Sequence, residues 1–401
     1  MNIFIDGRTI KQNPSGVGKW NLCLVRELLK KPISKIFLLL PNNCSYDFFS
    51  DKNLFSKEIN KKLILIKSSP PYQFVNKDRF LFEQFTLNKL IQKINPDIFH
   101  ATDSFGIPFN LNKKIATILT IHDLIPLTPY RELMSFPQYI LYKISLNISI
   151  KKAQKIVAIS DNTKKDIIKY LRLKENEISV IYNGVDRPSI FSSKNEKNRW
   201  QELSKNLKLT QKKYILYYGG FGKRRNIPTL IESFNQLLQK KIIPQDFKLV
   251  LSGRIINAKS EHLKNLLTLK TLIKKLHVEK NIIFLDYLND LDKAVLIKNA
   301  LFFCSLSLYE GFGLTPIEVL VYHIPAIFTC VGIWYSYNKP SNFIINNPLS
   351  KNEIIEKMTN LIKNKFNFKN DYNNLLSFID NFSWKKMVDE YYNLYKNLLF
   401  K

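Results

Sequence analysis

The stretch ALFFCSLSLYEGFGLTPIE, residues 300–318, decides the fold of this chain. Its mostly apolar first part, residues 300–308, predicts a short buried strand, and an acid follows at Glu310. After two glycines, Thr315 and Pro316 indicate the start of a helix, with the threonine as the cap and the proline in the first helical position. The stretch therefore predicts one strand–turn–helix unit of an α/β fold.

The predicted turn is a candidate anion site between two carboxylates. The first N–H groups of a helix have no partner within the helix and favour a phosphate, and here they belong to Gly313, Leu314 and Thr315. Glu310 and Glu318 are placed to accept hydrogen bonds from the hydroxyls of a sugar or ribose. A purely structural alternative exists, because Thr315 and Glu318 are also spaced as a capping box.

Strand-like runs alternate with helical patterns along the chain. Each run is short and apolar and ends in a polar residue or glycine. The runs lie at 2–7, 35–41, 97–103, 116–123, 155–160 and 179–184, then at 214–220, 248–253, 281–286 and before Glu310. Nearly continuous apolar runs suit strands covered on both faces, and their alternation with helices implies parallel sheets. We predict an α/β fold with two doubly wound domains.

The same pattern gives the expected domain boundaries. A chain of 401 residues is too long for one ordinary core and suits two domains. We expect an N-terminal domain over 1–186, a linker and lead-in helix over 187–211, and a C-terminal domain over 212–383. The serine-containing segment 187–197 is the best candidate for the linker, and an amphipathic pattern predicts a last helix over 384–399.

The chain is strongly basic, with 61 Lys and Arg against 33 Asp and Glu and a net charge of +28. Such a balance favours polyanionic partners: nucleic acid, anionic lipid or phosphorylated substrates. Lys, Asn, Ile, Phe and Tyr are all abundant, however, and their A- and T-rich codons allow compositional drift to explain the lysines. The lysines are scattered rather than gathered in one stripe with aromatic residues, so we expect no nucleic-acid partner.

Several features indicate a cytoplasmic protein. The four cysteines are far apart and form no disulfide framework or metal pair, which favours a reducing compartment. Asp6 and Arg8 interrupt the apolar start, so a signal peptide is not expected, and no apolar segment reaches the ~18 residues that span a bilayer. The segment 131–152 mixes apolar residues with Lys143 and Lys151, which suggests peripheral contact with an anionic membrane. Alternatively it is a core helix with a solvated edge.

Seven motifs in order carry a family resemblance. They are IDGRTI with SGVGKW, HATDSFGIP, TIHDLIPLTPY, IVAISDNTKKDI, SVIYNGVD, YYGGFGKRRNIPTLIESF and EGFGLTPIE. Together they resemble the group 1 glycosyltransferases of the retaining, GT-B type over nearly the whole chain. The resemblance implies two Rossmann-like domains facing across a cleft, with the donor nucleotide mainly on the second, the acceptor mainly on the first, and the last helix packed back on the first.

The resemblance also implies roles for the residues of the second domain. Glu310 corresponds to the family glutamate beside the donor sugar, and Glu318 to the one that holds the ribose hydroxyls. Gly311 and Gly313 let the main chain approach the ligand closely. Arg225 resembles the family's phosphate-binding basic residue, which offsets charge on the leaving diphosphate.

Further positions are assigned with less support from the residues alone. Lys223 and Arg224 are basic neighbours of Arg225, and Gly219 and Gly220 follow a predicted strand at the ligand-binding edge. In the first domain, His122 ends a strand and resembles a family histidine near the donor sugar, and Gly16 would approach the donor phosphates. Alternatively these groups are a solvated basic turn, a structural histidine and a plain tight turn.

The implied reaction transfers a hexose, with GDP-mannose as the first donor, to a saccharide or lipid-linked acceptor with retention of configuration. No cofactor or metal is expected, because Asp290 and Asp292 stand at a helix start, where aspartates complement the dipole. Three features depart from the family pattern: Gly220 replaces a second arginine, His323 replaces a glycine, and the stretch 331–343 lacks a Pro-Glu signature. A catalytically impaired sugar-nucleotide-binding protein and a GT-B epimerase are therefore alternatives.

Overall fold

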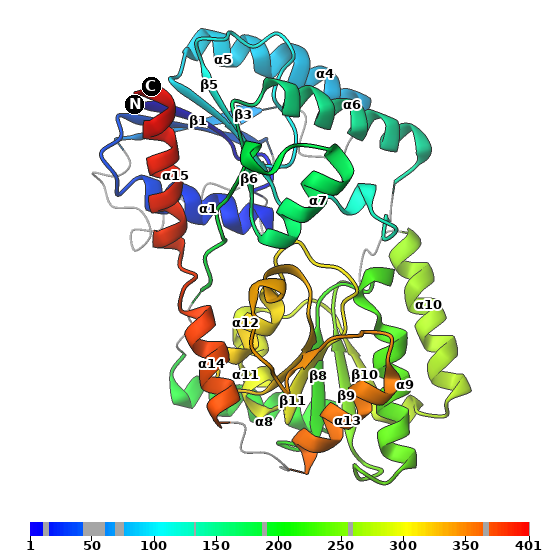
Figure 1. Ribbon diagram of the computed structural model, residues 1–401. Coiled ribbons are helices and arrows are strands. Elements are labelled where there is room, and N and C mark those ends of the chain that lie inside the picture. The colour runs from blue at the N-terminus through cyan, green and yellow to red at the C-terminus, as the bar shows by residue number, and fades with distance from the viewer. Residues whose placement is uncertain are drawn as a thin grey trace. The chain divides into compact units, whose positions relative to one another are not determined.

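The computed structural model describes residues 1–10, 16–42, 61–68, 76–131, 134–186, 191–255, 260–363 and 369–400. The chain divides into two compact units (Figure 1). Unit 1 consists of Met1–Gly184 together with Phe382–Lys401, and unit 2 consists of Val185–Asn381. The C-terminal segment thus belongs to the same unit as the N-terminus.

A parallel sheet forms the centre of unit 1. Its described strands lie in the order β3-β2-β1-β4-β5-β6-β7, and every neighbouring pair is parallel. Their bounds are β1 Asn2–Asp6, β2 Lys35–Pro41, β3 Leu63–Ser68, β4 Ile98–Ala101, β5 Ala116–Ile121, β6 Lys155–Ala158 and β7 Ile178–Val180. Every residue of β4 and β5 is buried, as expected for strands covered on both faces.

Helices cover both faces of this sheet. Side chains of β1 alternate between two core clusters, Ile3 and Ile5 in one and Phe4 in the other, because successive residues of a strand point to opposite faces. The first cluster lies under α1 and α15, and the second under η1, α5, α6 and α7. The helices are α1 Val17–Leu28, α4 Lys77–Leu81, the π-helix η1 Phe82–Leu87, α5 Asn88–Ile94, the 3-10 helix η2 Ile125–Leu127, α6 Phe136–Lys152, α7 Asp161–Leu171, the 3-10 helix η3 Glu175–Glu177 and α15 Trp384–Leu399.

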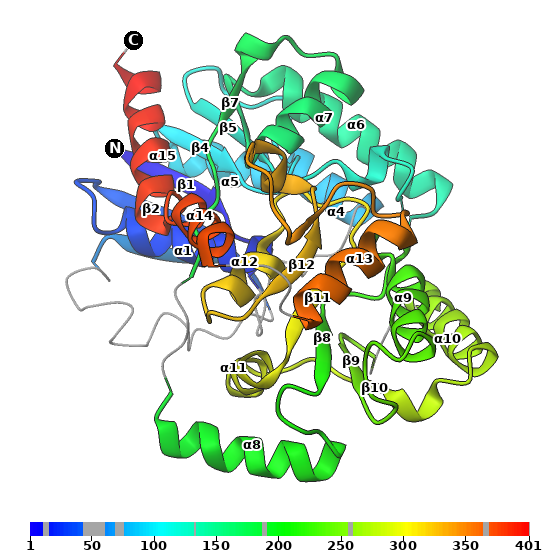
Figure 2. The same cartoon turned by 60° about the horizontal axis from the view of Figure 1, so that its bottom comes forward.

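Unit 2 is built on the same plan. Its described strands form a parallel sheet in the order β10-β9-β8-β11-β12-β13. Figures 1 and 2 show α9, α10 and α13 on one side of this sheet and α8, α11 and α12 on the other. The strands are β8 Tyr214–Tyr218, β9 Lys248–Ser252, β10 Ile282–Leu285, β11 Phe302–Ser305, β12 Ala326–Thr329 and β13 Ile344–Ile345. The α-helices are α8 Ser193–Leu207, α9 Ile227–Gln239, α10 Ser260–Lys275, α11 Asp290–Asn299, α12 Leu314–Leu320, α13 Lys351–Ile362 and α14 Lys369–Ile379, with 3-10 helices η4 Lys223–Arg225, η5 Glu279–Asn281 and η6 Gly332–Ser336.

The predicted fold class, two Rossmann-like parallel-sheet domains, is confirmed. The predicted strands did not include β3, β12 or β13, and the structure adds all three. Helix α8 begins at Ser193, within the predicted linker and lead-in helix 187–211, and the Ser192 hydroxyl accepts the backbone N–H of Asn195 as its N-cap. Residues 187–190 of that linker lie outside the described residues. None of the described helices is long and apolar enough to cross a bilayer.

Helix α15 is attached to the sheet of unit 1 by a buried chain of hydrogen bonds. One ring nitrogen of His100 lies 2.7 Å from the Tyr395 hydroxyl and the other 2.7 Å from the Thr120 hydroxyl, which in turn lies 2.9 Å from the Tyr391 hydroxyl. Burial lowers the pKa of His100 to about 3. The imidazole therefore stays neutral, and each of its nitrogens has a partner in the core.

This neutral imidazole makes the stability of unit 1 dependent on pH. His100 has a pKa of about 3 in the folded chain against 6.5 ordinarily, so below pH 6.5 the unfolded chain binds more protons. We expect the free energy of unfolding to fall as the pH is lowered from 6.5, by up to about 1.4 kcal/mol per pH unit from this residue. Urea unfolding of the wild type and of His100→Gln at a series of pH values measures it.

The variant cannot take up that proton, so its stability should depend less steeply on pH in this window. A matched control is His277→Gln, which changes an exposed imidazole and should keep the slope of the wild type. Equal slopes for the wild type and His100→Gln would show that His100 does not remain neutral in the folded protein.

Candidate active site

The candidate site of unit 2 lies where the strand order of the sheet reverses. Strand β8 lies between β9 and β11, so the connections that follow β8 and β11 leave the carboxyl edge on opposite sides of the sheet. Such a point leaves room for a ligand in a doubly wound sheet. The turn after β8 carries η4, Lys223–Arg225, and the turn after β11 carries Glu310.

Ion pairs of Glu310 join these two turns. One carboxylate oxygen accepts a hydrogen bond from Arg224 Nη1 at 2.9 Å, and the other is bound by Arg225 Nη1 and by the Ser307 hydroxyl, the latter at 3.0 Å. Arg224 also donates to the carbonyl oxygen of Tyr309 at 3.1 Å. Only 14% of the Glu310 side chain is exposed, so these contacts are shielded from solvent and stronger than surface ion pairs.

Backbone geometry brings the two turns close together. The Leu308 N–H donates to the carbonyl oxygen of Arg224 at 2.7 Å, which ties the turns directly. Gly219 has a φ of 148°, and a Cβ on Gly253 would lie 2.0 Å from the Gly219 carbonyl oxygen. These glycines are needed because the chain after β8 passes against the end of β9 with no space for a side chain.

Helix α12 begins earlier than the sequence predicted. Its N-cap is Gly313 with a φ of 88°, and its first residue is Leu314, so Thr315 is not the cap and Pro316 is not the first helical position. A left-handed φ is easy for glycine and costly for other residues, which explains why the helix starts there. The capping-box alternative is wrong, because the N-cap has no side-chain hydrogen bond.

Glu318 instead contacts side chains of β8 and α11. Its Oε2 accepts a hydrogen bond from the Tyr218 hydroxyl at 3.1 Å and lies 3.6 Å from Lys293 Nζ. Burial and the nearby Glu318 carboxylate raise the pKa of Tyr218 well above its ordinary value. The tyrosine thus remains a hydrogen-bond donor and fixes the carboxylate at the end of β8.

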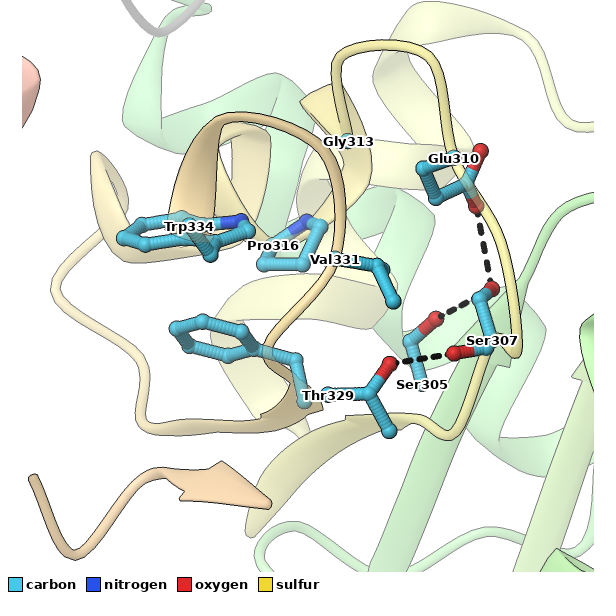
Figure 3. Close-up of a pocket in the computed structure, with 9 residues that line it drawn as sticks. Ser305, Ser307, Glu310, Gly313, Pro316, Thr329, Val331 and Trp334 are labelled. Atoms are coloured by element: carbon cyan, nitrogen blue, oxygen red, sulfur yellow. Dashed lines mark hydrogen bonds between the residues drawn. The ribbon is translucent and has the colours of Figure 1, made fainter. Parts of the chain in front are cut away.

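A small cavity of about 10 Å³, room for roughly one water molecule, lies beneath the Glu310 turn (Figure 3). Ser305, Ser307, Thr329 and Glu310 line one side of it, and Trp334 and Pro316 line the other. The fully buried indole Nε1 of Trp334 has no hydrogen-bond acceptor among the described residues. The cavity is a part of the same site and not a second pocket.

The stretch 331–343, which departs from the family pattern, packs against the turn that carries Glu310. Ile333 N–H donates to the carbonyl oxygen of Phe312 at 2.8 Å, and Trp334 packs on Phe328 with ring centroids 4.3 Å apart. Gly332 has a φ of 65° and approaches Phe312 so closely that an added Cβ would lie 2.2 Å from its oxygen. The segment therefore shapes the turn through its backbone.

His323 departs from the family pattern at a backbone position that favours glycine. Its φ is 59°, in the left-handed region. A histidine there costs on the order of 1 kcal/mol more than a glycine. The departure therefore affects the turn after α12 and not the contacts of Glu310.

The site residues predicted in unit 1 are His122 and Gly16. His122 is buried, its Nε2 lies 3.0 Å from the carbonyl oxygen of Thr102, and its ring makes a T-shaped contact with Trp20 with centroids 4.9 Å apart. Burial lowers the pKa of His122 to about 4. Gly16 is exposed at the N-cap of α1 with a φ of 55°. Trp20 follows on that helix, so α1 carries both the glycine turn and the group that holds the histidine.

The aspartates considered for a metal have other partners. Asp292 accepts two hydrogen bonds from Arg199 on α8, at 2.5 and 2.8 Å. The N-cap of α11 is Asn289, and Asp290 and Asp292 lie in its first turn, where they complement the helix dipole. Within the described ranges, no three His, Cys, Asp or Glu side chains are grouped as metal ligands would be.

The sequence reasoning found some residues of this cluster and missed others. The structure brings together Glu310 and Arg225, places Gly311, Gly313, Leu314 and Thr315 in the adjoining turn, and leaves Lys223 exposed. The sequence reasoning left the role of Arg224 undecided and did not name Ser307 or Tyr218. A signal for Arg224 was its position beside Arg225, but three adjacent basic residues do not reveal which ones face the acid.

Two family models match the chain. Residues 198–396 match the model of glycosyl transferases group 1, and residues 40–187 match that of glycosyltransferase family 4. Together these two matches span most of both units. The chain belongs to the group 1 glycosyltransferases, which confirms the family predicted from the seven motifs.

Several known proteins are similar to the chain. It is 21% identical over 322 residues to the O-antigen chain mannosyltransferase RfbU of Salmonella typhimurium, covering 80% of each chain. It is 23% identical over 337 residues to the serotype-specific mannosyltransferase WbdA of Escherichia coli, covering 80% of this chain and 39% of WbdA. The crystal structure of HepE from Anabaena, in complex with UDP and glucose, is similar with a TM-score of 0.72 and 14% identity, covering 99% of this chain and 100% of HepE.

The close approach at Gly332 gives a test of how the turn is supported. We expect Gly332→Ala to lower the free energy of unfolding by roughly 1–3 kcal/mol, because the new Cβ displaces the Phe312 backbone and the left-handed φ disfavours alanine. Gly220→Ala is the matched control, since no atom lies within 4 Å of its added Cβ. Denaturant unfolding of both variants checks this. Equal free energies of unfolding for the two variants would contradict the close packing of Gly332 on Phe312.

Proposed function

We propose that this glycosyltransferase moves a hexose from a nucleotide-diphosphate sugar to a saccharide or lipid-linked acceptor, with retention of anomeric configuration. Mannose is the first choice of sugar and GDP-mannose of donor. The names of RfbU and WbdA support mannose and the assembly of a surface polysaccharide. The chain is under 25% identical to both, so the sugar remains part of the proposal.

The observation that carries this proposal is the cluster of Glu310 with Arg224 and Arg225 at the reversal of the strand order. Two guanidinium groups held beside one carboxylate leave an excess of positive charge. A diphosphate is an anion that such a pair binds by charge-assisted hydrogen bonds. The same carboxylate remains 14% exposed, as a group that accepts hydroxyls of a donor sugar must be.

We assign the steps of transfer to these groups. Arg225, helped by Arg224, stabilises the negative charge that grows on the departing diphosphate. Glu310 binds sugar hydroxyls and stabilises positive charge at the anomeric carbon, while Glu318, fixed by Tyr218, accepts the ribose hydroxyls. Because guanidinium groups supply the positive charge, we propose that transfer needs no metal. Catalysis then rests on positioning and electrostatics.

The remaining assignments rest on the family resemblance. We propose that the backbone of residues 313–315 and of Gly311 approaches the diphosphate or the sugar, and that Gly219, Gly220 and Lys223 line the nucleotide. In unit 1 we propose that Gly16 and the neutral His122 contribute to donor binding and that the acceptor binds mainly to this unit. We further propose a cytoplasmic location, peripheral to the inner face of an anionic membrane.

Two alternative functions remain open to a direct test. A catalytically impaired sugar-nucleotide-binding protein fits the departures at Gly220 and His323 and would bind the donor without turnover. A GT-B epimerase would convert the donor without an acceptor. Product analysis of the donor with and without an acceptor separates transfer, epimerisation and binding alone.

The donor class can be identified by ligand stabilisation. A ligand that binds only the folded chain stabilises it by about 2.7 kcal/mol at roughly a hundred times its Kd. We expect GDP and GDP-mannose to raise the melting temperature more than UDP, ADP or their sugar conjugates. A thermal-shift panel of these compounds measures the order. A larger shift from UDP-glucose would overturn the GDP assignment but not nucleotide-sugar binding.

Removing the charge of Glu310 separates binding from transfer. We expect Glu310→Gln to lower transfer of labelled hexose by at least ~100-fold, because the carboxylate acts at the reacting sugar. Binding of the free nucleotide should persist or strengthen, because the two arginines lose their competing anion. Transfer assays and calorimetric titration with GDP measure the two effects.

The matched control is Glu232→Gln, which removes the carboxylate of another ion pair in unit 2, with Lys351 at 2.5 Å. It should leave both transfer and nucleotide binding unchanged. Full transfer activity in Glu310→Gln would remove Glu310 from the mechanism, whereas equal losses in both variants would indicate a general effect on the fold of unit 2.

A further inference from the structure

Helix α6 of unit 1 exposes a row of large apolar side chains. Phe136 is 73% exposed, Ile140 40% and Ile144 45%. Residues four apart lie on the same side of a helix, so the three form one stripe along its outer surface. The inner face of the helix is already occupied, because Tyr142 and Leu146 are buried in the core cluster under the sheet. The stripe is therefore additional to the core.

A second exposed group lies on the neighbouring helices. Leu81 at the end of α4, Phe85 in η1 and Phe109 in the following loop are all exposed. The Phe85 and Phe109 rings pack edge to face with centroids 6.5 Å apart, and the Phe109 N–H donates to Gln84 Oε1 at 2.8 Å. Helices α4 and α6 contact each other, and Figure 1 shows them adjacent. We call these six side chains with their surrounding lysines the α4–α6 face.

The charges around these side chains are predominantly positive. Helix α6 contains no Asp or Glu, and its lysines, Lys143, Lys151 and Lys152, are all exposed. Exposed lysines also follow the second group along the chain, at 89, 93, 113 and 114. Asp78 is the only exposed acid in α4, η1, α5 and α6. Apolar side chains bordered by many lysines and a single exposed acid suit a surface that is both apolar and negative.

We propose that the α4–α6 face is the surface by which the chain binds an anionic lipid bilayer. The inference rests on the proposed function in that it names the partner at which a lipid-linked acceptor would be met. Phe136, Ile140 and Ile144 enter the boundary between headgroups and acyl chains, and the lysines bind the headgroups. A helix lying in the interface needs this combination of an apolar stripe and flanking cations.

Charge complementarity favours a bilayer over other occupants. A second copy of this chain carries a net charge of +28 and would bring further lysines against the lysines of this face. A nucleic acid would use the cations but would leave Ile140, Ile144 and Leu81 without a partner, because these side chains offer no stacking surface. A bilayer of anionic lipid takes both kinds of side chain at once.

Vesicle co-sedimentation of the full chain tests this surface without any donor or acceptor. We expect binding to vesicles of phosphatidylglycerol and phosphatidylcholine, and at least tenfold weaker binding to phosphatidylcholine alone. Raising the salt from ~0.1 to ~1 M should weaken it, because headgroup attraction is screened. The double variant Ile140→Glu, Ile144→Glu and the double variant Lys143→Glu, Lys151→Glu should each lose at least tenfold in partition.

The matched control is Leu349→Glu, which places an acid at an apolar side chain that is 66% exposed in unit 2 and should bind vesicles as the wild type does. Melting temperatures of all variants establish that they fold. Equal binding to both kinds of vesicle, or equal losses in the control, would overturn the proposal, as would dimerisation or RNA binding abolished by the same variants without vesicle binding. Transfer to a soluble acceptor is assayed separately, so loss of membrane binding with intact transfer leaves the proposed function standing.

Discussion

The contact between Glu310 and the two arginines is the interaction on which the site of unit 2 depends. It joins the turn after β8 to the turn after β11, the two strands beside which the sheet reverses its order. A carboxylate that is mostly removed from water needs such partners, because an unpaired buried charge costs several kcal/mol. In the same turn, Gly313 adopts a left-handed conformation and is the N-cap of α12. The carboxylate of Glu310 and the start of α12 thus belong to one turn.

The two units use the same point of the sheet in different ways. In unit 1, the equivalent point beside β1 is filled by side chains of the unit itself: Arg8 binds both oxygens of Asp6, at 2.8 and 2.7 Å, and Glu83 at 2.8 Å. These three groups are almost wholly buried. In unit 2 the ion pairs of Glu310 remain partly exposed. The difference supports the proposal that an anionic donor binds to unit 2, where charged groups are accessible.

Much of the fold and part of the site followed from the sequence, for physical reasons that particular residues illustrate. Strands such as β5 read as continuous apolar runs because they are covered on both faces. Glu310 was found because it follows a predicted strand at the carboxyl edge of a parallel sheet, and Arg225 was found through its resemblance to the family's basic residue. The role of Arg224 was left undecided, since side-chain orientation within the single turn η4 depends on tertiary packing. The true N-cap was missed because the left-handed φ of Gly313 depends on Trp334 and residue 332 beneath it, which are distant in sequence.

The departures from the family pattern leave the charged contacts of the site in place. Gly220 supplies no second arginine, and no atom lies within 4 Å of the place where its Cβ would be. A second guanidinium nevertheless reaches the acid from Arg224, four positions along the chain, and the stretch after β12 supports the turn through the Ile333 N–H rather than through a side chain. His323 carries a backbone cost outside these contacts. Since two cations and one carboxylate persist at the reversal of strand order, the changes redistribute the charges of the site and do not remove them.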